Sequence, residues 1–198
     1  MRMNATDEAL DEIPEVGGPS PEIVGAPLPQ GERIRFGDEE YNQIADFLTE
    51  EAAMLDDVEY ARWFEMLHDD LIYRMPVRVS RPINDGNQFA GAMCHFDEDK
   101  STIMLKCRRL IMPFAWSENP SSRARRIVGT IRVFRTEDAN EYDVVSSIVV
   151  VRYRRDMEII SGKRIDLIRR CEDGLKLKRR TILSDQTTML TQNLTIFF

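Results

Sequence analysis

The sequence predicts an α+β domain in which helices pack on one face of a curved, largely antiparallel sheet. Residues 143–153 are dominated by β-branched side chains and contain neither glycine nor proline, so both faces of this strand are largely apolar. A strand that can be buried on both faces belongs in the middle of a sheet. Segments with apolar residues at helical spacing come first along the chain, and long alternating segments follow. This order is typical of α+β domains.

Length and charge indicate one well-buried domain with an acidic appendage. The chain has 198 residues, and residues 1–40 hold ten Asp or Glu against three Arg. The remainder is balanced, so it lacks the basic surface that nucleic-acid binding needs. The three cysteines are far apart, and no N-terminal signal or membrane-length apolar run is present. We therefore predict a reduced, cytoplasmic chain that binds neither nucleic acid nor membrane.

Residues 1–37 form a distinct N-terminal arm, and residues 38–198 form the domain. The arm contains five of the nine prolines, so little of it can form helix or ladder. Its acidic, proline-rich composition fits a disordered tail. The alternative is an extended arm on a partner, with apolar anchors at Ile13, Val16, Ile23, Val24 and Leu28.

Three helices are predicted. The first begins after Asp38, a plausible N-cap, and continues to Leu55. The second restarts at Asp56 or Asp57 and places Trp63 on its apolar face. The third covers residues 99–111 and is stopped by Pro113.

The strand pattern begins at residues 71–79, where apolar and polar residues alternate and Pro76 favours a sheet edge. Residues 81–96, which include Pro82 and Asn84-Asp85-Gly86, are predicted to be a loop. The remaining predicted strands are residues 125–135, 143–153, 158–169 and 175–183, with a hairpin turn at 172–174.

Residues that could carry chemistry are few. The only histidines are His68 and His95, so a Rieske cluster, which needs two Cys and two His in paired spacing, cannot be assembled. A mononuclear site with Asp69 or Asp97 is compositionally possible. The simpler role for His68 is to face the terminal carbonyls of the preceding helix.

Doubled arginines recur through the strands, but adjacent strand residues point to opposite faces, so most pairs split and form no nucleic-acid stripe. Asp166 lies between Ile165 and Leu167 and could act as an acid or base inside a cone-shaped pocket. Its alternative role is to pair with one of the strand arginines.

The sequence resembles the small (β) subunit of aromatic-ring-hydroxylating dioxygenases from about Asp38 to Phe198. Six blocks in matching order carry the resemblance: EEAAMLDD (50–57) with Trp63, YRMPVR (73–78), HFDED (95–99), AWSENPSSR (115–123), RRTILSDQ (179–186) and NLTIFF (193–198). It departs from the family near Arg126 and Thr130, where a His and an Asn are usual, and its arm is longer.

The resemblance implies a cystatin-like cone of the nuclear-transport-factor type. It further implies a trimer of small subunits beneath three large (α) subunits, which carry the Rieske [2Fe-2S] cluster and the mononuclear Fe(II). A reductase and usually a ferredoxin deliver electrons from NADH, and dioxygen is added to an arene to give a cis-dihydrodiol. No catalytic, cofactor-binding or metal-ligating residue is expected in this chain.

Subunit-contact or structural roles are expected for seven residues: Trp116, Arg123, Arg125, Arg179, Arg180, Phe197 and Phe198. The apolar ending predicts burial, because an exposed Leu-Thr-Ile-Phe-Phe tail would be prone to aggregation. The competing function is a self-sufficient cone-fold isomerase or dehydratase that uses Asp166, and a small-ligand or scaffold module is a third.

Overall fold

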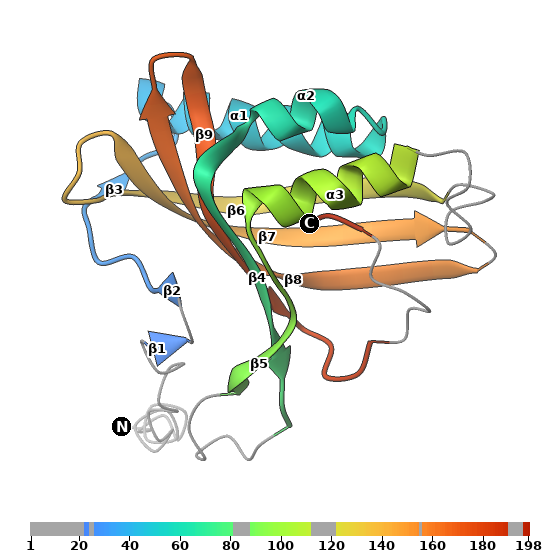
Figure 1. Cartoon of the computed structure of the whole chain (residues 1–198). Helices are drawn as coiled ribbons and strands as arrows, with labels where there is room; N and C mark the ends of the chain where they lie inside the picture. The colour runs from blue at the N-terminus through green and yellow to red at the C-terminus, as the bar shows by residue number, and fades with distance from the viewer. Residues whose placement is uncertain (1–21, 24–25, 81–87, 112–121, 155, 190–195) are drawn as a thin grey trace, which may run out of the picture.

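A seven-stranded sheet forms the body of the protein (Figure 1). The computed structural model describes residues 22–23, 26–80, 88–111, 122–154, 156–189 and 196–198. The sheet order is β3-β6-β7-β8-β9-β4-β5, and a separate hairpin of β1 (Glu22–Ile23) and β2 (Ala26–Pro27) precedes it. The seven strands are β3 (Arg33–Ile34), β4 (Leu67–Arg78), β5 (Phe89–Glu98), β6 (Arg123–Arg135), β7 (Glu141–Tyr153), β8 (Met157–Cys171) and β9 (Gly174–Ser184).

The predicted central strand is confirmed as β7, which lies between β6 and β8 with antiparallel registers along its whole length. Its core face is buried at Val144, Ile148 and Val150. Its other face is buried at Val145 but only half-buried or exposed from Ser147 onward. The domain itself therefore covers this second face only in part, and cover of the remainder by a partner chain stays a prediction.

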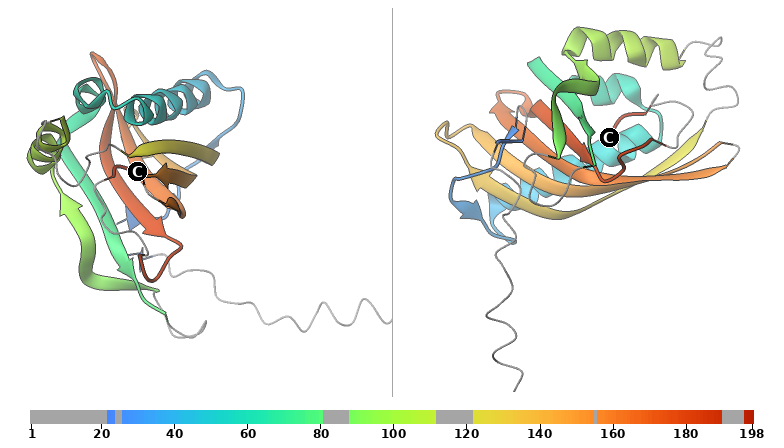
Figure 2. Two further views of the ribbon diagram at one scale, coloured as in Figure 1. Left: turned by 90° about the vertical axis from the view of Figure 1, so that its right-hand side faces the viewer. Right: turned by 90° about the horizontal axis from the view of Figure 1, so that it is seen from below.

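The helices α1 (Glu39–Asp56), α2 (Tyr60–Glu65) and α3 (Lys100–Ile111) lie on one side of the curved sheet, as predicted (Figures 1 and 2). Ile44 and Leu48 from α1, Trp63 from α2 and Ile103 from α3 join one hydrophobic core with the inner faces of the strands. The second helix is much shorter than the predicted segment, because β4 begins at Leu67 and takes the residues after Met66 into the sheet.

Two predictions at the β4–β5 pair are wrong. Residues 89–96 are part of strand β5, which pairs antiparallel with β4, and not part of a loop. Pro76 is not at an edge, because β4 lies between β9 and β5. The register of β4 against β5 shifts on both sides of Pro76, so a bulge accommodates the residue that lacks an N–H.

Asp99 fixes the start of α3. Its Oδ1 accepts hydrogen bonds from the Thr102 backbone N–H at 2.8 Å and from the Ser101 hydroxyl at 2.7 Å. These donors favour the charged carboxylate and lower the pKa of Asp99 from 3.8 to about 2.

We expect a carboxyl titration of Asp99 by NMR to give a pKa about two units below that of an unstructured Asp. Because the pKa is depressed, the stability from this charge is fully present above pH 3.8 and is lost as the pH falls through about 2. Asp99→Asn keeps a capping oxygen and should remove most of this pH dependence. An ordinary Asp99 pKa would contradict the cap.

Across the described ranges, no helix is both long and apolar enough to cross a membrane.

Candidate functional site

A buried cluster of four charged side chains lies inside the cone, between α1 and the inner face of the sheet. Arg180 on β9 donates from Nη1 and Nη2 to the two oxygens of Glu51 on α1, at 2.7 and 2.8 Å. It also donates from Nε and Nη2 to the two oxygens of Asp166 on β8, at 2.9 and 2.8 Å. All three side chains are fully buried, so Arg180 ties the helix to two strands.

Arg164 is the fourth member of this cluster, which we call the interior network. It donates from Nε to the Ser146 hydroxyl at 3.1 Å, and its Nη1 lies 3.5 Å from Glu51. Its Nε is also 3.9 Å from Asp166. Two buried carboxylates and two buried guanidinium groups therefore balance in charge.

Mutual pairing offsets the cost of removing Glu51 and Arg180 from water. Desolvation by burial raises the pKa of Glu51, but the positive charges of Arg180 and Arg164 outweigh it, so the net shift is downward. Desolvation likewise lowers the pKa of Arg180, yet Asp166 and Glu51 raise it well above its ordinary value. Burial and the neighbouring Arg180 charge lower the pKa of Arg164.

The chain segment 196–198 is joined to this network. The carbonyl oxygen of Phe198 accepts from Arg180 Nη1 at 2.6 Å and from the Tyr73 hydroxyl at 3.0 Å. The Phe198 backbone N–H lies 2.7 Å from the same hydroxyl. Burial raises the pKa of Tyr73 to about 12, so its hydroxyl stays protonated at physiological pH.

Phe197 is held by a second set of contacts. Its ring lies 4.4 Å from that of Trp63, between ring centroids. Its carbonyl oxygen accepts from Arg126 Nε and Nη2 at 3.1 and 2.9 Å, and Arg126 Nη1 donates to Asp56 at 2.5 Å. Ile196, Phe197 and Phe198 are therefore buried within their own domain, so the predicted burial is confirmed for these three residues, and Leu194 lies outside the described residues.

The contacts of Asp166 indicate a structural role and not one in acid–base catalysis. Both oxygens of Asp166 are occupied by Arg180, and the carboxylate is fully buried. A general acid or base must reach the proton that it transfers. The arginine-pairing role predicted as the alternative for Asp166 is the one that the structure gives it.

Three of the predicted site residues come together here, namely Arg180, Phe197 and Phe198. Arg179 points to the other face of β9, 3.5 Å from Asp143. The predicted splitting of doubled arginines is confirmed at β6, where the Arg126 side chain is 3% exposed and the Arg125 side chain is 73% exposed. Arg123 is exposed on β6, and Trp116 lies outside the described residues.

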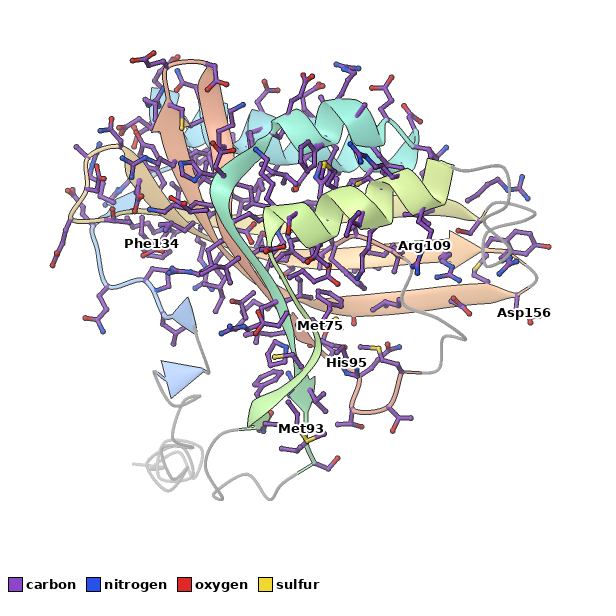
Figure 3. The ribbon with its side chains drawn as sticks, viewed as in Figure 1. Met75, Met93, His95, Arg109, Phe134 and Asp156 are labelled. Atoms are coloured by element: carbon purple, nitrogen blue, oxygen red, sulfur yellow. The ribbon has the colours of Figure 1, made fainter. Side chains whose placement is uncertain are left out.

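The two histidines lie far apart. His68 is in β4, beyond the end of α2, where its Nδ1 accepts from the Asp70 backbone N–H at 3.1 Å. The predicted role at the helix end is therefore wrong. His95 lies on β5 beside Met75 (Figure 3), on the order of 25 Å along the β4–β5 pair from His68. Burial lowers the pKa of His95. Among the residues that the structure describes, no group of three His, Cys, Asp or Glu could hold a metal ion.

Sequence reasoning missed Glu51, Arg164 and the role of Tyr73. A signal for Glu51 was present, because it lies on the α1 stripe of Ile44, Phe47, Leu48 and Leu55. Arg164 and Asp166 similarly alternate with buried Ile160 and Ile168 on one face of β8. Charged residues in register with an apolar face indicate a buried network.

Comparison with known proteins identifies relatives across most of the chain. The sequence model of the ring hydroxylating beta subunit family matches residues 50–191. Benzene 1,2-dioxygenase subunit beta of Pseudomonas putida is 38% identical over 164 residues, which cover 79% of this chain and 88% of that protein. Biphenyl 2,3-dioxygenase subunit beta of Rhodococcus jostii strain RHA1 is 36% identical with the same coverage.

A solved structure extends the comparison to the fold. It is a naphthalene 1,2-dioxygenase with indole bound in its active site, and it matches with a TM-score of 0.74 and 22% sequence identity over 84% of this chain and 90% of that chain. The fold and the interior network define a cone-shaped α+β protein whose buried charges serve its architecture. The chain belongs to the beta subunits of ring-hydroxylating dioxygenases, and the family resemblance of its sequence is confirmed.

Proposed function

We propose that this chain is the structural, non-catalytic small subunit in the oxygenase component of an aromatic-ring-hydroxylating dioxygenase. It assembles with a large α subunit that holds the Rieske cluster and the mononuclear iron, in a cytoplasmic hexamer of three large and three small subunits. A ferredoxin and a reductase supply electrons from NADH to the complex. The large subunit then converts an arene to a cis-dihydrodiol.

The observation that carries the proposal is the family match over residues 50–191, which includes the end of α1, helices α2 and α3, strands β4 to β9 and the interior network. The contacts of Asp166 favour this proposal over the isomerase or dehydratase alternative. Asp166 would be the acid or base of such an enzyme, but both of its carboxylate oxygens already accept hydrogen bonds from Arg180. The three free cysteines, Cys94, Cys107 and Cys171, agree with a reduced compartment.

The predicted site residues divide into two groups under this proposal. Arg180, Phe197 and Phe198 shape the domain from within and so hold its outer surface in the form that the other subunits meet. Arg123 and Arg125 project outward from β6 and are candidates for contacts beyond the domain. The proposed division is an arm of residues 1–37 and a cone of residues 38–198, with β3 of the arm paired to β6 at the edge of the cone's sheet.

Coexpression with the large subunit tests the proposal. We expect this chain to copurify in equimolar amount with a red-brown partner, in a particle whose native mass fits three copies of each. The chain purified alone should be colourless, hold no stoichiometric iron and turn over no arene, whereas the complex with its reductase and ferredoxin should do so.

Metal analysis of the isolated chain could contradict the proposed structural role. About one tightly held iron per isolated chain, lost on replacing His68 or His95, would overturn the structural role. Failure to copurify with any large subunit, together with activity of the chain alone that depends on Asp166, would favour the isomerase or dehydratase alternative.

A further inference from the structure

An exposed apolar surface lies on the outer face of the sheet, opposite the helices. Cross-strand partners point to the same face, and the registers Ile127↔Val149, Val151↔Ile159 and Tyr153↔Met157 place six apolar residues together. We call this set the outer patch: Ile127, Val149, Val151, Tyr153, Met157 and Ile159. Ile127, Ile159, Met157 and Tyr153 are 62%, 55%, 68% and 44% exposed. Contiguous exposure of this kind marks an interaction site.

Basic side chains border the outer patch. Arg123 lies over the Tyr153 ring at 5.4 Å, and Arg123 and Arg125 continue the same outward-facing rows of the sheet. Arg125 is 4.0 Å from Asp56, the limit of an ion pair, and is largely exposed. Lys163 follows on β8, opposite Ser147. A partner that combines apolar anchors with carboxylates would match this surface in both respects.

Such a partner segment is present in the chain itself, in residues 7–16. It contains five carboxylates, Asp7, Glu8, Asp11, Glu12 and Glu15, and no basic residue. The apolar residues Leu10, Ile13 and Val16 lie between or beside them. The segment belongs to residues 1–21, which are outside the described part of the chain.

Another part of the arm already contacts the outer face. Leu28 packs against Phe89, Ile165 and Leu183, which form a small cluster on that face, away from the outer patch. Ile165 lies on the same outward-facing side of β8 as Ile159, six residues further along the strand, and Leu183 of β9 lies opposite Lys163 on that face. An apolar residue of the arm can therefore pack on the outer face of the sheet. The outer patch lies away from this contact and remains exposed.

The arm of the same copy joins the domain at the end of the sheet that is far from the outer patch. Strands β1 and β2 lie at the end away from the turn that contains Asp156, where the outer patch is found (Figures 1 and 3). Strand β7 has 13 residues and spans about 40 Å. Ile13 precedes Glu22 by nine residues, a reach of about 30 Å at most. A neighbouring copy can supply the segment without this restriction.

We propose that residues 7–16 of one copy dock on the outer patch of a neighbouring copy, with Leu10, Ile13 and Val16 on the apolar residues and the carboxylates facing Arg123 and Arg125. This inference rests on the proposed function, because it requires several copies in one assembly.

Disulfide trapping in the complete complex tests the docking. The double variant Ile13→Cys/Ile159→Cys is coexpressed with the large subunit and oxidised mildly, and peptides are identified by mass spectrometry. We expect a disulfide between the two introduced cysteines that joins different chains, seen as covalent dimers and trimers on a non-reducing gel. The matched control is Ile13→Cys/Ile72→Cys, since Ile72 is an exposed apolar residue on β4.

Charge reversal adds a readout specific to the proposed contact. Adding Arg123→Glu and Arg125→Glu, or raising the salt concentration, should slow the trapping at least about fivefold. Two results in a complex of normal native mass would overturn the docking: disulfide formation no faster than in the Ile72 control, or disulfides only within a single chain. Either result would leave the proposed function intact. A chain that forms no complex at all would contradict the proposed function itself.

Discussion

Replacing Phe198 with alanine should lower the free energy of unfolding by about 3 to 5 kcal/mol, the usual cost of truncating a buried phenylalanine. The ring packs in the core near Phe96, at 6.3 Å between centroids. Ending the chain at Ile196 should be more severe. That deletion also removes the carbonyl acceptors of Arg180 and Arg126, and buried donors without partners are costly.

Chemical denaturation of the isolated chain measures the first effect, and size-exclusion chromatography with the large subunit measures the second. Phe36→Ala is the matched control, because Phe36 is 86% exposed and its removal should change stability little. We expect the chain that ends at Ile196 to give little soluble protein or assembled complex. A normal complex peak at normal yield would show that the ending is dispensable.

Glu51→Gln should be almost as damaging, although it changes no side-chain volume. It leaves Arg180 and Arg164 facing one buried carboxylate instead of two, and breaking a buried ion pair in this way typically costs about 3 to 5 kcal/mol. Glu50→Gln is the matched control on the same helix, because Glu50 is exposed. Equal stabilities of the two variants would show that the interior network is not a source of stability.

The pH dependence of the Glu51→Gln effect has a definite sign. The pKa of Glu51 is lower in the folded protein than its ordinary 4.5, so the carboxylate contributes its full stability above pH 4.5. That contribution disappears as the pH falls through the lowered pKa. The difference in unfolding free energy between the wild type and Glu51→Gln should therefore be largest near neutral pH and shrink in acid.

Most of the fold could be predicted because its elements follow local patterns. Apolar residues recur with a period of 3.6 in α1 and α3 and alternate with polar residues in β6 to β9, and both patterns depend only on neighbouring residues. The helices and strands predicted from these patterns are confirmed. Strand β5 was missed because Ala90, Gly91 and Cys94-His95 lack strand-forming side chains. Its pairing with β4, and not its own composition, makes it a strand.

The interior network could be predicted only in part. The arginine partner of Asp166 was anticipated as a type of contact, but its identity depends on the register of β8 against β9, where Asp166 lies opposite Arg180. Glu51 and Arg180 are 129 positions apart, and Tyr73 and Phe198 are 125 positions apart. Only the assembled sheet with α1 packed on it brings such residues together, so no local pattern specifies them.

The burial of Phe198 also decides how the protein can be handled. Its side chain and main chain are both enclosed, with Arg180 and Tyr73 on its carbonyl oxygen. An affinity tag or fluorescent fusion placed after Phe198 would have to leave from the centre of the core and displace these contacts. A fusion placed before Met1 leaves the contacts of Phe198 unchanged. A tag on the partner subunit leaves both ends of this chain unmodified.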